Sequence, residues 1–234
     1  MSVGSVAGTP PRGQLWAWLV LVGVVTALNY ATRLAAGGEE DRSTVLYEYG
    51  TAVGGAIFYL VLLTVVVFIA RGLPAREVFA LRQPRSWGAA AWRMAVALAA
   101  IWGANLVLTY ALGLRAGVVQ VMVPDECDPV RAVEFEANFA VIAFVGPVVE
   151  ELTYRGLGFW ALRAVYGVAV AIGVTSLVFG ASHGLVAGLP ALTVFGLAAA
   201  WLRLATDSVY PATILHVAFN GLALLAAVTL EADL

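Results

Sequence analysis

Six long stretches of the sequence contain no charged side chain, and they constrain its fold more than any other feature. They cover residues 13–32, 49–70, 94–114, 137–149, 164–202 and 208–230. A helix needs about 20 mostly apolar residues to cross the hydrocarbon core of a membrane. The stretch 164–202 is long enough to cross twice, and Gly188 and Pro190 offer a turn near its middle. We therefore expect an all-α, polytopic membrane helix bundle of about seven transmembrane helices.

The overall composition agrees with a membrane protein and argues against a soluble one. Hydrophobic residues make up 62% of the 234 positions and charged residues 12%, whereas soluble domains carry about 25% charged residues. Residues 14–32 exceed the apolar core of a signal peptide, usually about 7 to 15 residues, which favours an uncleaved anchor. Because the sequence shows no repeat and no separate polar region, we expect residues 1–234 to form a single integral membrane domain.

The basic residues, all of them arginine, are distributed unevenly between the loops. The segment 71–93 holds five Arg and one Glu, whereas the segments 33–48 and 115–136 are both acidic. The positive-inside rule places the basic segment in the cytoplasm. With seven spans, the N-terminus is then cytoplasmic and the C-terminus lies outside. An arginine-only basic complement in an Ala- and Gly-rich chain also suggests a GC-rich genome, so we expect a bacterial cell membrane.

Three charged residues interrupt the fourth span, which is otherwise apolar from about residue 137 to 165. Burying a charged side chain at the centre of a membrane helix costs about 2.5 to 3.5 kcal/mol, so such residues usually have a partner or a function. Glu151 and Arg155 are four residues apart and can form an ion pair along the helix. Glu150 points about 100° away and is free to face a polar cavity. Pro147, one turn earlier, lacks an N–H and could open the helix backbone.

The chain has only two histidines, and both lie in apolar spans. His183 and Glu150 are equally distant from a predicted turn at Tyr166 and Gly167, about 25 Å along each helix. Antiparallel neighbouring helices would bring both side chains to the same depth. We therefore expect Glu150 and His183 to share one cavity.

The second histidine, His216, lies in the last span together with Asn220. The two residues are four apart, so they are neighbours on one helical face and can point inward together. The same depth argument does not place His216 well, because it lies only about nine residues beyond Asp207. Tilted or broken helices are needed to bring His216 to Glu150.

Three short motifs resemble those of the CAAX protease and bacteriocin-processing family, also called Abi. They are EELTYR at 150–155, FGASH at 179–183 and HVAFN at 216–220. Each motif alone is weak, but three in order on membrane spans are specific. The resemblance covers about residues 137–225, which we expect to form the catalytic core.

The resemblance implies an intramembrane endopeptidase of the CAAX prenyl protease type, related to the CAAX prenyl endopeptidase Rce. In this scheme Glu150 and His183 activate a water molecule that hydrolyses a peptide bond near the membrane. His216 and Asn220 would stabilise the oxyanion that develops on the carbonyl. Such donors matter, because removing one can slow a hydrolase roughly 10²- to 10³-fold.

The remaining motif residues have supporting roles in this scheme. Glu151 and Arg155 would hold the helix, and Phe179 would pack beside His183, one turn away. The expected partners are the lipid bilayer and a peptide or protein substrate at the membrane, with no nucleic acid.

Two alternatives stay open at the level of the sequence. No cofactor is predicted, but Glu150, His183 and His216 could instead form a His₂Glu zinc set, although the HExxH motif of many zinc proteases is absent. The chain could also be a non-proteolytic membrane scaffold or bacteriocin-immunity factor of the same fold. A small transporter that uses intramembrane Glu and His as a proton relay is a third possibility.

Overall fold

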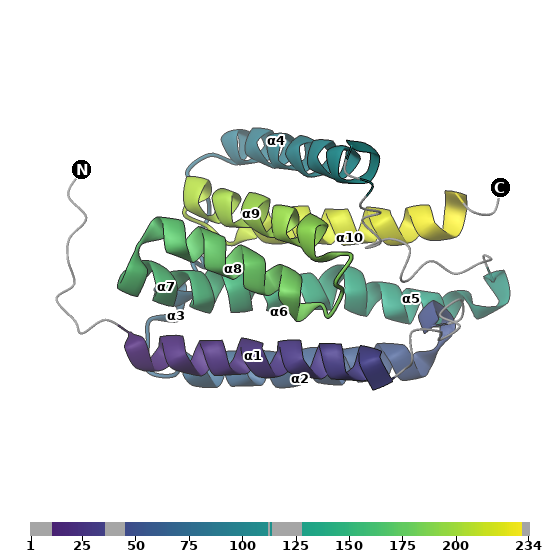
Figure 1. The fold of residues 1–234 in the computed structure, drawn as a ribbon, viewed down its shortest axis with the longest axis horizontal. Coiled ribbons are helices and arrows are strands. Elements are labelled where there is room, and N and C mark those ends of the chain that lie inside the picture. The colour runs from purple at the N-terminus through teal and green to yellow at the C-terminus, as the bar shows by residue number, and fades with distance from the viewer. Residues whose placement is uncertain (1–10, 36–44, 112, 114–127, 231–234) are drawn as a thin grey trace.

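The computed structural model of the protein describes residues 11–35, 45–111, 113 and 128–230. This part of the chain is helical and contains no strand. The α-helices, shown in Figure 1, are α1 (Arg12–Ala35), α2 (Tyr49–Ile69), α3 (Ala75–Val78), α4 (Trp87–Leu106), α5 (Ala132–Ala140), α6 (Gly146–Glu151), α7 (Phe159–Tyr166), α8 (Val168–Ser182), α9 (Leu189–Thr206) and α10 (Tyr210–Leu230).

The apolar helices fall in the regions predicted to span the membrane. Five segments are long and apolar enough to cross: Arg12–Ala35, Tyr49–Ile69, Trp87–Ala111, Pro129–Tyr166 and Leu189–Thr206. Two shorter apolar segments, Val168–Ser182 and Tyr210–Ala226, accompany them. The prediction of an all-α polytopic helix bundle is confirmed, and the protein is an integral membrane protein.

The fourth predicted span is one helical segment that is interrupted twice by π-helical turns. Wide π-helical turns, η4 (Val141–Val145) and η5 (Leu152–Gly158), lie on either side of α6. Pro147 is in the first turn of α6, and because it has no N–H it cannot donate to the preceding turn. π-Helical turns are rare and often occur at functional sites. Glu150 and Glu151 therefore lie on a short α-helical segment between two irregular ones.

Helix α8 is shorter than a typical membrane span. Its 15 residues span about 22 Å, compared with a hydrocarbon core of about 30 Å. The helix ends at Ser182, and Gly184 follows with a φ of +68°. A Cβ at Gly184 would also lie 2.9 Å from the backbone of Asn29. Both the positive φ and this close contact therefore require glycine at position 184. The predicted turn at Gly188 and Pro190 is present but starts earlier, since the chain leaves the helix after Ser182 and α9 begins directly after Gly188.

The motif-bearing helices occupy the middle of the bundle. In Figure 1, α6 to α10 lie between the pair α1 and α2 on one side and α4 on the other. The Leu189–Thr206 span is 50% buried and the Trp87–Ala111 span only 11%, which identifies α9 as central and α4 as peripheral. Helices α8 and α9 approach closely, because a Cβ at Gly196 would lie 2.8 to 3.0 Å from Ser176. The short turn between α7 and α8 is at Gly167, with a φ of +85°, as predicted.

Candidate active site

A cavity of about 350 Å³ lies between α1 and α2 and the motif-bearing helices. Glu150 of α6 and His183, directly after α8, both line it. Tyr59 of α2 and Asn29 of α1 line it as well. The structure thus brings Glu150 and His183 to one cavity, as their matched depths predict.

Glu150 is held at this cavity by contacts to both of its oxygens. The hydroxyl of Tyr59 donates a hydrogen bond to Oε1 at 2.8 Å. Oε2 lies 3.8 Å from Nε2 of His216, and the side chain is 14% exposed. The carboxylate is therefore oriented by its neighbours while still reaching the cavity, which is the placement that a general base needs.

His183 is fixed at the end of α8 by its own helix. Its Nδ1 lies 2.7 Å from the backbone carbonyl of Phe179. A carbonyl accepts only, so Nδ1 carries the proton and Nε2 of the neutral ring has a lone pair. Arg33 of α1 donates through Nε to the His183 carbonyl at 3.1 Å. His183 can therefore accept a hydrogen bond through Nε2 with its ring orientation fixed.

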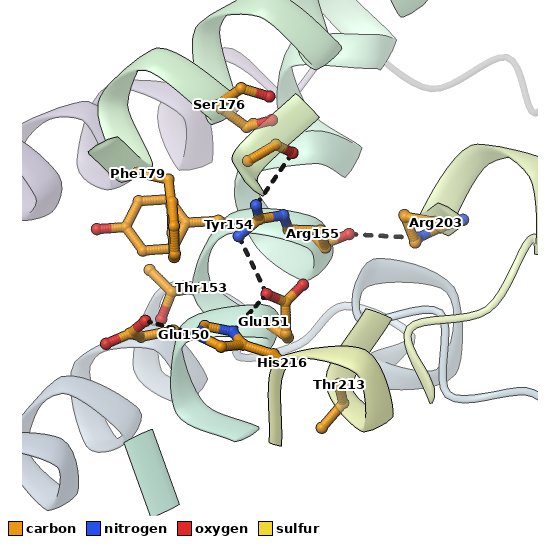
Figure 2. Close-up of polar contacts among 12 residues, drawn as sticks. Glu150, Glu151, Thr153, Tyr154, Arg155, Ser176, Phe179, Arg203, Thr213 and His216 are labelled. Carbon is orange, nitrogen blue, oxygen red and sulfur yellow. Dashed lines mark hydrogen bonds and ion pairs between the residues drawn. The ribbon is translucent and has the colours of Figure 1, made fainter. Parts of the chain in front are cut away.

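Glu151 lies on the other side of the His216 ring from Glu150 (Figure 2). Its Oε1 is 2.9 Å from Nδ1 of His216 and 3.1 Å from Nη1 of Arg155. Glu151 and Arg155 are completely buried. The predicted ion pair between these two residues is present, and the same carboxylate also holds His216. The structure thereby places His216 beside Glu150, which the depth argument could not do.

Arg155 connects α9 to the glutamate helix. Its Nη2 donates to the carbonyl of Gly196 at 3.1 Å, and its guanidinium lies 4.4 Å from the ring centre of Phe179. Arg203 donates through Nε to the backbone carbonyl of Arg155 at 3.2 Å, as drawn in Figure 2. Arg155 therefore makes polar, ionic and aromatic contacts at the same time, which only a planar guanidinium can do.

Phe179 is the aromatic centre of the site. Its ring lies 4.8 Å from that of His183 and 5.6 Å from that of His216, measured between ring centres. Tyr154 and Phe195 pack against it at 5.4 and 5.7 Å. Rings at these distances and mostly at steep angles form favourable aromatic pairs. One buried phenylalanine thus contacts both histidines and fixes their relative positions.

Asn220 lies outside the cavity lining. Its Nδ2 donates to the backbone carbonyl of Ile142 at 3.1 Å, and Ile142 itself lines the cavity. Asn220 therefore reaches the cavity through a neighbouring backbone group, in contrast to Glu150 and His183.

Two tyrosines at the site were not predicted from the sequence. Tyr59 contacts Glu150 as described, and Tyr154 donates from its hydroxyl to Oγ of Ser182 at 2.7 Å. Ser182 in turn donates to the carbonyl of Phe179 at 2.9 Å. Tyr154 belongs to the EELTYR motif, so its place in the sequence could have indicated that it lies at the site. For Tyr59 the signal was weaker: a tyrosine in the middle of a span, away from the interfaces where tyrosine is common.

A metal site would need several histidines or carboxylates to lie together. Among the described residues, no three His, Cys, Asp or Glu side chains are placed together to hold a metal ion. Glu150, His183 and His216 do not form such a group in the described part of the chain.

The comparison with known proteins matches the part of the chain that carries the three motifs to a family. Residues 133–222 match the family model described as type II CAAX prenyl endopeptidase Rce1-like. No curated protein and no solved structure matches the chain. The matched region runs from α5 to α10, so it includes Glu150, His183 and His216 but not Tyr59. The resemblance that the three motifs indicate is thus confirmed independently.

Proposed function

From the premise that residues 133–222 form a domain of the type II CAAX prenyl endopeptidase Rce1-like family, we propose that the protein is an intramembrane endopeptidase. It hydrolyses a peptide bond near the membrane with a water molecule activated by Glu150. The observation that carries this proposal is the position of Glu150, held at a cavity that His183 also lines.

The proposed first step is attack of water on the substrate carbonyl. Glu150 takes a proton from the water through Oε2, since Tyr59 occupies Oε1. The water oxygen bonds to the carbonyl carbon, and the developing negative charge moves to the carbonyl oxygen. His183 orients the water by accepting its second O–H at Nε2. A general base of this kind accelerates hydrolysis by about 10²- to 10⁴-fold.

In the second step the tetrahedral intermediate collapses and the carbon–nitrogen bond breaks. Glu150 returns its proton to the leaving amine, so the carboxylate is regenerated. The products are a carboxylic acid and an amine, and no electrons are gained or lost. One carboxylate thus serves as base and then as acid.

His216 is the proposed donor to the oxyanion. Its Nδ1 donates to Glu151, so Nε2 must carry a second proton to donate to substrate. This imidazolium would sit between two carboxylates and near Arg155, a set of four charges that sums to zero. Asn220 remains a proposed second donor, because its amide has another N–H besides the one bound to Ile142.

The cavity lining supports a peptide or protein substrate that approaches from the membrane. Apolar side chains, among them Phe58, Leu62 and Val141, line it together with Glu150 and His183. Such a lining can accept apolar substrate residues while the charged groups act on the backbone. We propose no cofactor and no nucleic-acid partner, a bacterial cell membrane as the location, and a cytoplasmic N-terminus.

The test is a comparison of protein termini in membranes that contain the wild type, Glu150→Gln or His183→Ala. Substrate termini should be present with the wild type and lost with both variants, a fall of at least about 100-fold for Glu150→Gln. Glu136→Gln is the matched control, because Glu136 is an exposed carboxylate on α5 in the same helical segment. Termini that persist unchanged in Glu150→Gln would overturn the proposal and favour a non-proteolytic scaffold or immunity factor.

A further inference from the structure

Tyr59 is the contact between the active-site glutamate and a helix outside the family-matched region. It lies near the middle of α2, ten residues after Tyr49, whereas the matched region begins at residue 133. Its neighbour Leu60 is exposed, as expected for a side chain that faces lipid. Tyr59 instead is partly buried and directs its hydroxyl to Glu150.

The glutamate helix is shaped to receive this side chain. Gly146 and Glu150 are four residues apart, so they lie on one face of the helix. A Cβ at Gly146 would lie 2.8 Å from both Cζ and the hydroxyl oxygen of Tyr59. The phenol therefore occupies the space above Gly146, and from there its hydroxyl reaches Oε1 of Glu150. Any larger residue at position 146 would displace the ring.

We propose that Tyr59 is a positioning residue for the catalytic carboxylate, and that Gly146 is sterically required because it leaves space for the Tyr59 ring. The proposal rests on the function proposed for Glu150. Tyr59 holds Oε1 so that Oε2 is the oxygen presented to water and to Nε2 of His216, 3.8 Å away. A hydrogen bond to a charged group is among the stronger ones, and it fixes which oxygen of Glu150 accepts the proton.

Kinetic measurements can distinguish a positioning role of Tyr59 from a role in substrate binding. A positioning residue acts on the chemical step, so its loss should lower kcat and leave KM nearly unchanged. A residue that only binds substrate should raise KM instead. Because Tyr59 also lines the cavity, it could contact substrate, and a change in either kcat or KM is physically possible.

The first experiment measures kcat and KM of Tyr59→Phe and Gly146→Ala with a quenched-fluorescent peptide that carries the cleavage sequence found in the terminus comparison. We expect each variant to lower kcat roughly tenfold, the value of one hydrogen bond to a charged group. Gly146→Ala should keep its helix, because alanine favours a helix more than glycine does. The double variant should be no slower than either single one, since both remove the same contact.

Two matched controls accompany these variants. Tyr166→Phe removes the hydroxyl of an exposed tyrosine, and Gly173→Ala adds a methyl where no atom lies within 4 Å. Both should retain the wild-type kcat. An unchanged kcat in Tyr59→Phe, a rise in KM alone, or additive losses in the double variant would each overturn the proposal.

The second experiment needs no substrate and follows Glu150 itself. Dicyclohexylcarbodiimide enters membranes and adds a carboxylic acid across its carbon–nitrogen double bond, with the oxygen bonding to carbon and the proton going to nitrogen. Mass spectrometry should show that Glu150 is modified several-fold faster in Tyr59→Phe and Gly146→Ala than in the wild type, because Oε1 has lost its donor. Equal rates would reject the positioning role even if the protein is not a protease, whereas faster modification with no Glu150-dependent cleavage would reject only the proposed function.

Discussion

His216 donates through Nδ1 to Glu151 at 2.9 Å, which makes a carboxylate buried in α6 the anchor of a histidine on α10. The same oxygen of Glu151 pairs with Arg155. Its second oxygen has no hydrogen-bond partner among the described residues. The two adjacent glutamates thus have different roles. Glu150 faces the cavity, and Glu151 holds a histidine and an arginine in place.

Glu151→Ala should destabilise the protein strongly, because it leaves the guanidinium of Arg155 buried without an anion. Removing one partner of a buried ion pair typically costs about 3 to 5 kcal/mol. Thermal unfolding in detergent would measure the loss. Glu77→Ala is the control, since Glu77 pairs with Arg82 while 55% exposed, and such a surface pair is worth about 1 kcal/mol or less. Equal effects of the two variants would contradict this account of Glu151.

Arg155→Lys should also reduce stability, although it keeps the charge. A lysine ammonium can approach Glu151, but it has no planar group to lie over Phe179 while also donating to Gly196. We expect a loss of about 1.5 to 3 kcal/mol, the contribution of a hydrogen bond made by a charged group. The measurement is again thermal unfolding, with Arg71→Lys on the exposed loop after α2 as the control. Wild-type stability in Arg155→Lys would show that charge alone suffices.

Gly196→Ala should separate α8 from α9. The added Cβ would meet the backbone of Ser176 at 2.8 to 2.9 Å, and a helix backbone cannot move as easily as the end of a side chain. Because the Gly196 carbonyl also accepts from Arg155, the shift should reach the candidate active site. We expect a loss of about 1 to 3 kcal/mol in stability and reduced cleavage. Gly103→Ala, where no atom lies within 4 Å, should leave both unchanged.

The apolar spans and the polar residues inside them could be predicted because the bilayer imposes simple rules. Charge-free stretches give the helices, and buried charges such as Glu150 and Glu151 stand out against them. The spacing of Glu151 and Arg155 predicts their ion pair, and the turn at Gly167 gives the matched depth of Glu150 and His183. These inferences use distances along one helix or across one turn.

The rest depends on contacts between helices far apart in the sequence. His216 reaches Glu150 and Glu151 through the way α10 packs on α6, which no local spacing encodes. The contact of Tyr59 with Glu150 spans 91 positions. The early end of α8 likewise follows from the close approach of Asn29 to Gly184, a tertiary contact. These contacts are set by the packing of helices against one another, so the periodicity and spacing of residues in the sequence could not predict them.

Chelation should leave activity intact if Glu150 acts on water directly. Purified protein treated with EDTA and 1,10-phenanthroline should cleave its peptide at the untreated rate. Both Nδ1 atoms of the histidines already have partners in Phe179 and Glu151, which orients the rings without a metal. A loss of activity that added zinc restores would instead support the His₂Glu alternative. Metal analysis of the purified protein is the independent check.

The orientation of the chain can be tested through its single cysteine, Cys127, which lies outside the described residues. The acidic segment 115–136 is predicted to face outward, because the positive-inside rule keeps the basic segment 71–93 in the cytoplasm. A membrane-impermeant maleimide should therefore label Cys127 in intact cells. In a Cys127→Ser background, a cysteine introduced as Arg76→Cys should react only after the membrane is opened, since Arg76 is exposed in the basic segment. The reverse pattern would invert the topology and place the N-terminus outside.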